Sequence, residues 1–450
     1  MGLNRLVTAA IVTIFGVFTL SSNAIADEPA NAPIVSTPGS NQSAGGPTVW
    51  NANQEVSALS GDRTLDPEFQ AKGIPMGVFR LFPTLNTSVS YDDNVFRLPN
   101  GGQSDFFFTE TPSLLLDYET NDAHVDFYTD GTFDQYTKLT TVDTDQYDVG
   151  VKGSYLVTRA TQVTGNISYS QLAEALSSAD TVASQDAPNV YTLFDVSGQV
   201  QYKPNRLALI IGGDRDAYHY FNTSLFGGGE LYNGDRSNMI SKGFGEVSYD
   251  FSPGYAGYLK ATYNDDGFEQ YYDRSGYHRA SHGYQFDAGV NLLLGELVQG
   301  TVYLGYVDQM YDHTQQPGLL PLEDISGLDF GADLVWYPTE LLTVELKGSR
   351  QIVNTTFAGA AGGDDRNVTL SASWEVTRRV YVTANAGYDD TDYNGAGLDE
   401  TVPTFGVGLK YIISHYVQAQ LNYQYSTRNA SLTGLNYNDN LVSLGLNLQI

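Results

Sequence analysis

Acidic side chains at alternate positions are the clearest candidates for chemistry in this sequence. Asp126, Asp130 and Asp134 recur at even spacing within one stretch. Side chains two or four residues apart share one face of an extended strand, so these carboxylates are expected to form a row. A row of carboxylates repels anions, attracts cations and accepts hydrogen bonds from hydroxyl groups. The spacing therefore indicates a binding or conducting surface rather than a reaction centre.

Further charged residues fall on the same predicted face of neighbouring segments. The basic ones are few, and tyrosines such as Tyr128, Tyr258 and Tyr303 lie among them, where they can stack on sugar rings. The predicted lumen-lining set is Asp126, Asp130, Asp134, Lys152, Asp195, Glu246, Lys260, Asp329, Asp333, Glu345, Lys347, Glu375 and Lys410. A second interpretation stays open: these charges only solvate a water-filled interior and pair with the lysines.

The sequence offers only weak candidates for catalytic or metal-binding residues. His278 and His282 are four residues apart, but in a segment that reads as a loop, where this spacing is poor evidence for a metal. Asp389 and Asp390 would point to opposite faces of a strand, so they do not form an acid–base pair. The sequence contains neither a G-x-S-x-G elbow nor a phosphate-binding glycine loop. We expect no enzyme, no cofactor and no catalytic or metal-binding residues.

Composition narrows the class of protein. The chain has 450 residues with 23 Lys and Arg against 52 Asp and Glu, a formal net charge of −29. This sign argues against a nucleic-acid partner, because a phosphate backbone requires a basic surface. The absence of cysteine excludes disulfide scaffolds, thiol nucleophiles and thiolate zinc sites.

The N-terminal part differs from the rest. Residues 1–26 resemble a cleaved signal peptide, with Arg5, an apolar core and Ala24-Ile25-Ala26 before the cleavage point. Residues 27–79 are rich in Pro, Ala, Asn, Ser and Gly and show no period, so we expect a partly disordered periplasmic extension. A docking arm for a periplasmic partner is the alternative for this extension.

From residue 80 to 450 the pattern has a period of two. Val417, Ala419, Leu421, Tyr423 and Tyr425 alternate with Gln418, Gln420, Asn422, Gln424 and Ser426. Each such segment predicts a strand with one apolar and one polar face. Because the polar face carries amides and charges, it suits a wet lumen, and the apolar face is then expected to contact lipid.

The connections alternate between tight turns and longer polar loops. Tight turns near 121, 159, 204, 253, 295, 338, 378 and 414 recur about every 40 residues, with long loops such as 173–189 and 221–236 between them. This layout predicts an all-β fold: a transmembrane, antiparallel, up-and-down β-barrel of about 18 strands over 80–450, with 16 strands as the alternative. A soluble sandwich or propeller fits less well, since each repeat holds two long strands.

Aromatic residues at strand ends predict interfacial girdles in an outer membrane. Phe106, Tyr118, Tyr202, Tyr249, Trp336, Tyr337, Tyr411 and Tyr416 occupy such positions. We therefore expect outer-membrane lipid and lipopolysaccharide as surroundings, and the barrel-assembly machinery as a partner, although Ile450 replaces the usual terminal aromatic residue. Acidic loops suggest cation bridging to lipopolysaccharide or, more simply, solvated loops.

The start of the barrel resembles a known family. Residues 73–83 read GIPMGVFRLFP, residues 91–97 read YDDNVFR, and Ser104-Asp105 and Thr111-Pro112-Ser113-Leu114 follow. These motifs are similar to those of the β-barrel porin 2 family of bacterial outer-membrane proteins, whose layout covers about 70 to 450. The resemblance implies a role in exopolysaccharide or capsule export, with polysaccharide and periplasmic export components as partners.

Three functions remain to be compared. The first is an outer-membrane pore that facilitates exopolysaccharide export. The second is a plugged barrel that supports envelope or polysaccharide assembly without conductance, and the third is an outer-membrane enzyme. An inward-folded loop would distinguish the first two, and 173–189 and 221–236 are long enough to fold inward.

Overall fold

A single closed sheet forms the wall of this protein. The computed structural model describes residues 68–178, 180–182, 184–294, 297–432 and 434–450. The predicted signal peptide and most of the predicted extension lie outside the described residues. Within them, a nineteen-stranded sheet consists of the short β1 (Ile74–Met76) and eighteen barrel strands. The predicted all-β barrel of 18 strands is confirmed, and the alternative of 16 is wrong.

The barrel strands are β2 (Phe79–Asp92), β3 (Asp105–Glu119), β4 (Ala123–Tyr136), β5 (Thr144–Thr158), β6 (Thr161–Ala173), β7 (Val190–Tyr202), β8 (Leu207–Tyr220), β11 (Asn238–Ser252), β12 (Tyr255–Phe268), β13 (Ser281–Leu294), β14 (Val298–Tyr311), β15 (Ile325–Thr339), β16 (Leu342–Val353), β17 (Gly363–Thr377), β18 (Val380–Tyr393), β19 (Leu398–Ser414), β20 (Val417–Ala430) and β21 (Tyr437–Gln449).

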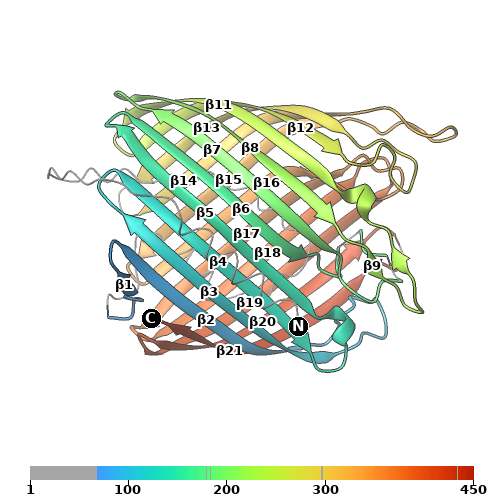
Figure 1. Cartoon of the computed structure of the whole chain (residues 1–450), viewed down its shortest axis with the longest axis horizontal. Helices are drawn as coiled ribbons and strands as arrows, with labels where there is room; N and C mark the ends of the chain where they lie inside the picture. The colour runs from blue at the N-terminus through green and yellow to red at the C-terminus, as the bar shows by residue number, and fades with distance from the viewer. Residues whose placement is uncertain (1–67, 179, 183, 295–296, 433) are drawn as a thin grey trace. The chain divides into compact units, whose positions relative to one another are not determined.

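Every strand pairs antiparallel with its neighbours in the chain, and the ring closes between its ends. β2 pairs with β21 from Thr84 opposite Gln449 to Asp92 opposite Leu441. Closure leaves no strand edge without hydrogen-bond partners, which a lipid environment requires. Figure 1 shows the tilted strands of this wall.

Alternating burial reveals which face points inward. On β20, Leu421 is 47% exposed, whereas Gln418 is 2% exposed. The apolar side chains therefore cover the outside and the polar ones the inside, the reverse of a soluble barrel. Among the described residues, no helix is long and apolar enough to cross a membrane.

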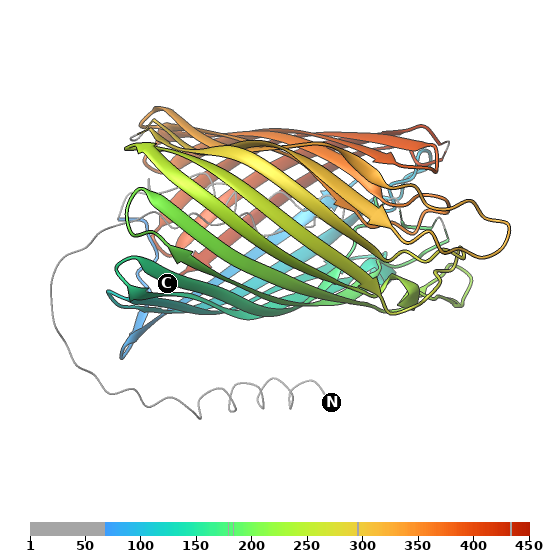
Figure 2. The same ribbon diagram turned by 90° about the horizontal axis from the view of Figure 1, so that it is seen from above.

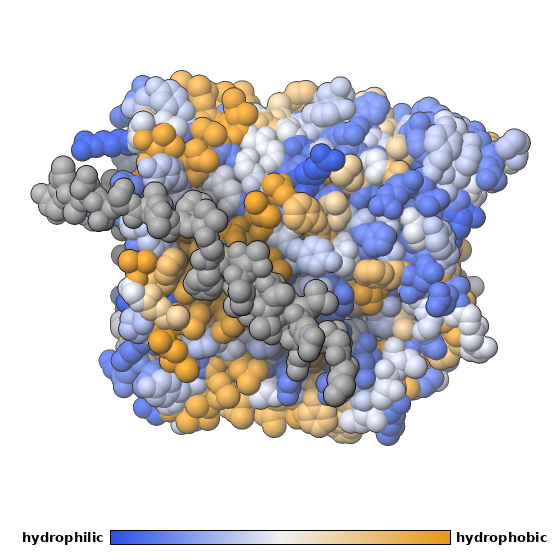
Figure 3. All heavy atoms as spheres, viewed as in Figure 1, coloured by the Kyte–Doolittle hydropathy of each residue, from blue (hydrophilic) through white to orange (hydrophobic). Residues whose placement is uncertain are grey.

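The outer surface carries aromatic residues close to the short turns. Tyr202, Tyr249, Trp336, Tyr411 and Tyr416 are all exposed there. Figure 3 shows apolar side chains over the strands and mostly polar ones toward the loop end of the barrel. One predicted girdle residue is placed differently: Tyr337 is buried, and its hydroxyl accepts a hydrogen bond from Gln299 Nε2 at 3.0 Å.

Short turns and long loops occupy opposite ends of the barrel. Turns such as Arg378-Arg379 join strands at one end, while loops 174–189, 221–237, 269–280, 312–324 and 354–362 gather at the other (Figure 2). The turn predicted at Pro338-Thr339 lies instead at Glu340-Leu341. The ladder shifts register between Trp336 and Thr339, as it does before the turns after β5, β11, β17 and β19, so Pro338 lies within a bulge that precedes the turn.

Candidate functional site

The inner surface has one side rich in carboxylates, which we call the acidic wall. It comprises the inward-facing charged residues of β4 to β15: Asp126, Asp130, Asp134, Asp148, Lys152, Asp195, Asp214, Asp216, Lys242, Glu246, Lys260, Asp287, Asp329 and Asp333. Asp126 lies 3.6 Å from Lys152, and Asp214 lies 3.5 Å from Lys242. Such loose, solvated pairs contribute little energy, so the carboxylates stay available to mobile ions.

The registers place all thirteen predicted residues on the inner face. Nine of them belong to the acidic wall. On β16, Glu345 and Lys347 form an ion pair at 2.8 Å, and Lys347 also lies opposite Asp333 of β15. Glu375 and Lys410 lie apart from the rest: Glu375 is opposite Tyr381, and Lys410 is buried beneath the lumen surface at 3% exposure.

Several acidic-wall residues were missed by the sequence reasoning. Lys242 stands four residues before the predicted Glu246, and Asp148 stands four before Lys152, so the period of two contains the signal for both. Gln285 was also missed. Its Nε2 donates to Asp329 at 2.6 Å and to Asp287 at 3.1 Å, so one amide joins carboxylates of β13 and β15 across Gly305 of β14.

Three inner tyrosines each lie over a glycine of the next strand. The register pairs Tyr128 with Gly150, Tyr258 with Gly289 and Tyr303 with Gly331. A Cβ added at Gly331 would stand 2.2 Å from the Tyr303 ring, and the other two pairs are equally close. Each ring therefore lies flat along the wall, as aromatic residues do over strand glycines. A flat ring presents a stacking surface to the lumen instead of obstructing it.

The opposite side of the inner surface is uncharged over most of its length, and we call it the amide wall. It comprises Thr383 and Asn385 of β18, Gln418, Gln420, Asn422, Gln424 and Ser426 of β20, and Ser443 and Asn447 of β21. The registers place these side chains on the same face as Lys410 of β19. This wall offers amide and hydroxyl groups only, so it hydrogen-bonds without selecting a charge.

Loop 174–189 extends across the lumen at the loop end. The carbonyl oxygen of Ser177 accepts a hydrogen bond from Arg428 Nη1 of β20 at 2.8 Å. Asp180 Oδ1 accepts hydrogen bonds from Thr355 Oγ1 and from Thr356 N, both at 2.8 Å. Since β6 and β7 lie far around the barrel from β17 and β20, the loop narrows this end, and it is one of the two loops whose length allowed inward folding.

Loop 221–237 binds the two ends of loop 174–189, next to β6 and β7. Arg236 donates to Glu174 with both terminal nitrogens, at 2.8 and 2.6 Å, and both residues are buried. Burial alone would lower the pKa of the Arg236 guanidinium, but the charge of Glu174 outweighs it and raises that pKa. Asn233 Nδ2 adds a bond to Asn189 Oδ1 at 3.1 Å. Both predicted inward candidates therefore contribute to one narrowed end.

A second ion pair connects loops 221–237 and 269–280. Arg274 donates from Nε and Nη2 to Asp235, each at 2.8 Å, and its backbone N–H donates to the same carboxylate. Burial would raise the pKa of Asp235, but these hydrogen bonds outweigh it and hold the pKa below its usual range. The charged form of Asp235 thus stabilises the loop arrangement.

The sequence motif at 91–97 stabilises the closure of the barrel, where β2 pairs with β21. Arg97 lies 3.0 Å from Asp92 and 2.9 Å from Asp439 on the last strand. Asp93 accepts hydrogen bonds from the backbone and side chain of Asn440 at 2.8 and 2.7 Å. Asp92, Asp93 and Asp439 are close enough to share a metal ion, but the Arg97 guanidinium already pairs with Asp92 and Asp439.

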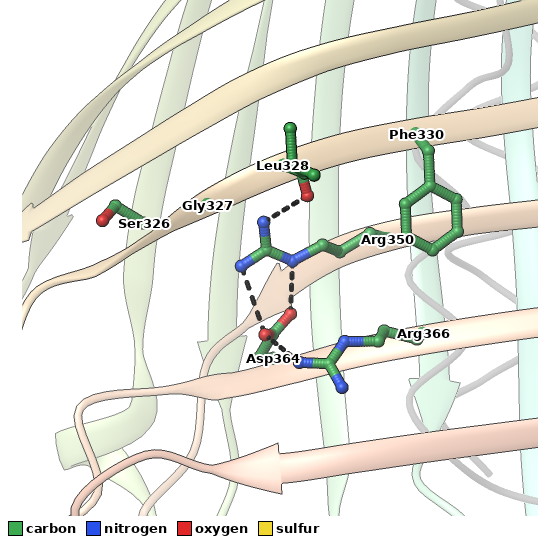
Figure 4. Close-up of a pocket in the computed structure, with 7 residues that line it drawn as sticks. All are labelled: Ser326, Gly327, Leu328, Phe330, Arg350, Asp364 and Arg366. Carbon is green, nitrogen blue, oxygen red and sulfur yellow. Dashed lines mark hydrogen bonds and ion pairs between the residues drawn. The ribbon is translucent and has the colours of Figure 1, made fainter.

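A shallow pocket on the outer face contains unexpected charges. Arg350 donates to Asp364 at 2.6 Å and to the carbonyl oxygen of Leu328 at 2.6 Å, and Arg366 reaches the same Asp364 at 2.6 Å (Figure 4). Leu328 beside them is exposed. These charges lie at the loop ends of β15 to β17, where the wall leaves the apolar zone, and their mutual pairing accounts for them without a ligand.

The opposite mouth holds the first described residues of the chain. Phe69 is 4% exposed and packs against the inward-facing Tyr381 and Ile412. Its carbonyl oxygen accepts a hydrogen bond from Gln449 Nε2 at 3.1 Å, and the Arg379 guanidinium lies 5.5 Å from its ring centre. The chain is therefore anchored inside the turn end of the barrel before β1 begins.

Comparison with protein-family models gives one match over most of the chain. Residues 66–450 match the family described as "Putative beta-barrel porin 2". The match includes every barrel strand and the anchor at Phe69. No curated protein matches the chain.

Solved structures that are similar to this chain at low sequence identity include three porins. OccK2 (OpdF) of Pseudomonas aeruginosa, solved in complex with glucuronate, is 10% identical, with a TM-score of 0.45 over 83% of this chain and 98% of that one. A BenF-like porin from Pseudomonas fluorescens Pf-5 is 12% identical, with a TM-score of 0.43 over 82% and 99%. OpdK of Pseudomonas aeruginosa is 11% identical, with a TM-score of 0.40 over 82% and 99%.

Proposed function

The chain belongs to the Putative beta-barrel porin 2 family of outer-membrane β-barrels, and from this premise we propose that it is a channel that facilitates export of exopolysaccharide. The substrate class follows from the family resemblance together with the chemistry of the inner surface. The channel would pass neutral or cationic, hydroxyl-rich chains and disfavour anionic ones.

The flat tyrosines are the observation that carries this proposal. Tyr128, Tyr258 and Tyr303 present ring faces among carboxylates and amides that accept and donate hydrogen bonds. Sugar rings combine an apolar face with a rim of hydroxyl groups, so an aromatic face beside carboxylates is complementary to them. A smooth wall without projecting rings also suits a polymer that must slide past it.

A plugged barrel with a structural role is the second candidate. The crossing of loop 174–189 to Arg428 and the seat of Phe69 narrow the two ends of the lumen. In that case periplasmic export components would bind the barrel without using it as a path. Lipopolysaccharide surrounds the outer rim under either proposal.

Single-channel recording separates the two candidates. The refolded full chain is placed in a planar bilayer, and the current is measured with and without neutral oligosaccharide. The channel proposal expects steady current that oligosaccharide interrupts, and Tyr303→Ala is expected to shorten the interruptions. A matched variant, Tyr423→Ala on the outer face, should leave them unchanged. A folded barrel with no current would favour the structural role.

A further inference from the structure

A histidine and two aspartates meet on the inner face of the barrel, beside the short turn that joins β3 and β4. Asp117 of β3 lies directly opposite Asp126 of β4, and His124 lies two residues before Asp126, so all three side chains share one face. The His124 Nε2 atom is 3.0 Å from Asp117 Oδ1 and 3.2 Å from Asp126 Oδ1. We call these three residues the turn-end cluster.

The two carboxylates of this cluster need a cation between them. Like charges directly opposite each other in a ladder are destabilising. Lys152 lies 3.6 Å from Asp126 Oδ2, but its side chain is 59% exposed. Arg80 of β2 lies opposite Asp117, but its guanidinium donates to a backbone carbonyl oxygen at 3.1 Å. Among the described residues, only His124 places a basic nitrogen within 4 Å of Asp117.

The distances in the turn-end cluster match those between ligands of one metal ion. Ligand atoms about 2.0–2.2 Å from a zinc ion, and about 90–110° apart around it, lie roughly 2.8–3.6 Å from each other. Both N···O distances at His124 fall in this range. A ring nitrogen carries at most one hydrogen, which can be directed well at only one carboxylate, whereas a metal ion bound to the same nitrogen contacts both.

We propose that Asp117, His124 and Asp126 bind one divalent transition-metal ion, of which zinc is the type, at the turn end of the acidic wall. The imidazole nitrogen distinguishes this site from a group of carboxylates alone, because it favours zinc, nickel and copper over calcium and magnesium. The two carboxylates balance the charge of the ion. The expectation of no metal-binding residues is thereby replaced, since sequence spacing does not reveal that Asp117 lies opposite Asp126.

The turn-end cluster is held by the wall and open to the lumen. The side chains of Asp126 and Asp117 are 11% and 23% exposed, whereas that of His124 is 41% exposed. An ion can therefore enter from the water-filled side, and water can complete its coordination. The acidic group at the closure of the barrel is different, because Arg97 already pairs with two of its carboxylates.

A bound ion would change the acidic wall where it meets the turn-end mouth. It would neutralise two carboxylates at the point where cations enter or leave, so cation current along this wall would fall. This effect on current rests on the proposed channel function, whereas the metal site itself does not.

Isothermal titration calorimetry tests the site on the full chain, refolded in detergent and stripped of metal. Zn²⁺ and Ca²⁺ are titrated separately near neutral pH, where the ligands can lose their protons. We expect a saturable Zn²⁺ site and at least about tenfold weaker binding of Ca²⁺. His124→Gln and Asp117→Asn, with folding verified by heat-modifiable mobility in gels, should each weaken Zn²⁺ binding at least about tenfold.

His415→Gln is the matched control for these variants. His415 also lies at a short turn, but its ring contacts the ring of Tyr416. This variant should leave the affinity for Zn²⁺ unchanged. Equal affinity of the full chain and His124→Gln for Zn²⁺ overturns the proposal. Equal affinity of the full chain for Ca²⁺ and Zn²⁺ also overturns it, because this result indicates general attraction to carboxylates.

Addition of Zn²⁺ in the planar bilayer tests the effect on current. We expect the potassium conductance of the full chain to fall by about one-third to one-half, and that of His124→Gln to stay unchanged. Zn²⁺ binding without a change in current overturns the effect on conduction and leaves the site in place. If neither folded protein conducts, the channel function fails, while calorimetry still decides whether the site exists.

Discussion

The acidic wall and the amide wall line the same lumen and differ in what they offer a solute. The acidic wall pairs its carboxylates loosely with lysines, as between Asp126 and Lys152 at 3.6 Å, and its side chains range from half-buried, as at Asp130, to buried, as at Asp329. The amide wall is uncharged between Lys410 and Arg428 on its strands and is almost completely buried. The two walls therefore differ chiefly in charge: one offers carboxylates to cations, and the other offers neutral hydrogen-bonding groups in covered positions.

Removal of the ion pair at the loop end of the amide wall is the largest expected effect. Arg428→Met leaves Glu400 buried without its partner and also releases Ser177. Breaking a buried pair by removing one member typically costs about 3–5 kcal/mol. We expect a loss of this size in the free energy of unfolding, measured by urea titration in detergent. Arg366→Met removes an outer-face side chain that is 43% exposed, and Asp364 keeps its bond to Arg350, so this variant should cost no more than about 1 kcal/mol.

A new charge on each wall tests the difference in solvation. Asn422→Asp places a carboxylate in a covered position, so we expect a loss of about 1–3 kcal/mol in the free energy of unfolding. Thr164→Asp places the same charge on the half-buried face of β6, opposite Gln199 and Ser154, and should cost less than about 1 kcal/mol. Equal losses at the two positions would show that the walls do not differ in solvation.

Neutralising the acidic wall should change ion selectivity more than stability. The triple variant Asp130→Asn, Asp195→Asn and Asp333→Asn retains volume and removes three inner charges. We expect the potassium-to-chloride permeability ratio, measured by reversal potential, to fall roughly two- to fivefold. Ser443→Ala on the amide wall is the control and should leave the ratio unchanged. A change of similar size in the control would remove the distinction between the walls.

The smallest expected effect concerns pH and the loops. The pKa of Asp235 is held below its usual range, so its charged form stabilises the folded loops above the unfolded pKa of about 4, and this stability is lost as pH falls through the lower folded value. Hydrogen exchange of residues 269–280, corrected for intrinsic rates, should therefore increase only below about pH 4. Arg274→Gln should move this increase to higher pH. An unchanged onset in that variant would contradict the assigned cause.

Most of the barrel could be predicted because the sequence patterns that specify its strands and turns are local. The period of two in 417–426 and 442–450 determines which side chains face lipid, and the alternating connections give the strand number. The turn at Glu340-Leu341 lies two residues beyond the predicted one, because Pro338 is accommodated in a bulge and does not end the strand. Tyr337 was predicted to lie in a girdle because aromatic residues occur next to turns on both faces of the wall. Whether such a residue points to lipid or to the lumen depends on the local register of its strand.

The site was less predictable, because its contacts are long-range. The bond between Ser177 and Arg428 joins residues 251 positions apart, and no local pattern signals it. The motif at 91–97 was recognised as a family feature. Its role in closing the barrel depends on contacts with Asp439 and Asn440 of the last strand, which the motif itself does not reveal. Pairs such as Tyr303 and Gly331 depend on register between strands, which sequence spacing alone leaves undetermined.

Reversal potential in a salt gradient is the most direct test of the central claim, that the lumen is an aqueous channel bounded on one side by carboxylates. The full chain and the variant Asp130→Asn, Asp195→Asn and Asp333→Asn are compared in the same planar bilayer. The account predicts current in both, with potassium favoured over chloride in the full chain and less so in the variant. Anion selectivity of the full chain, or the absence of current from both proteins when folded, would contradict it.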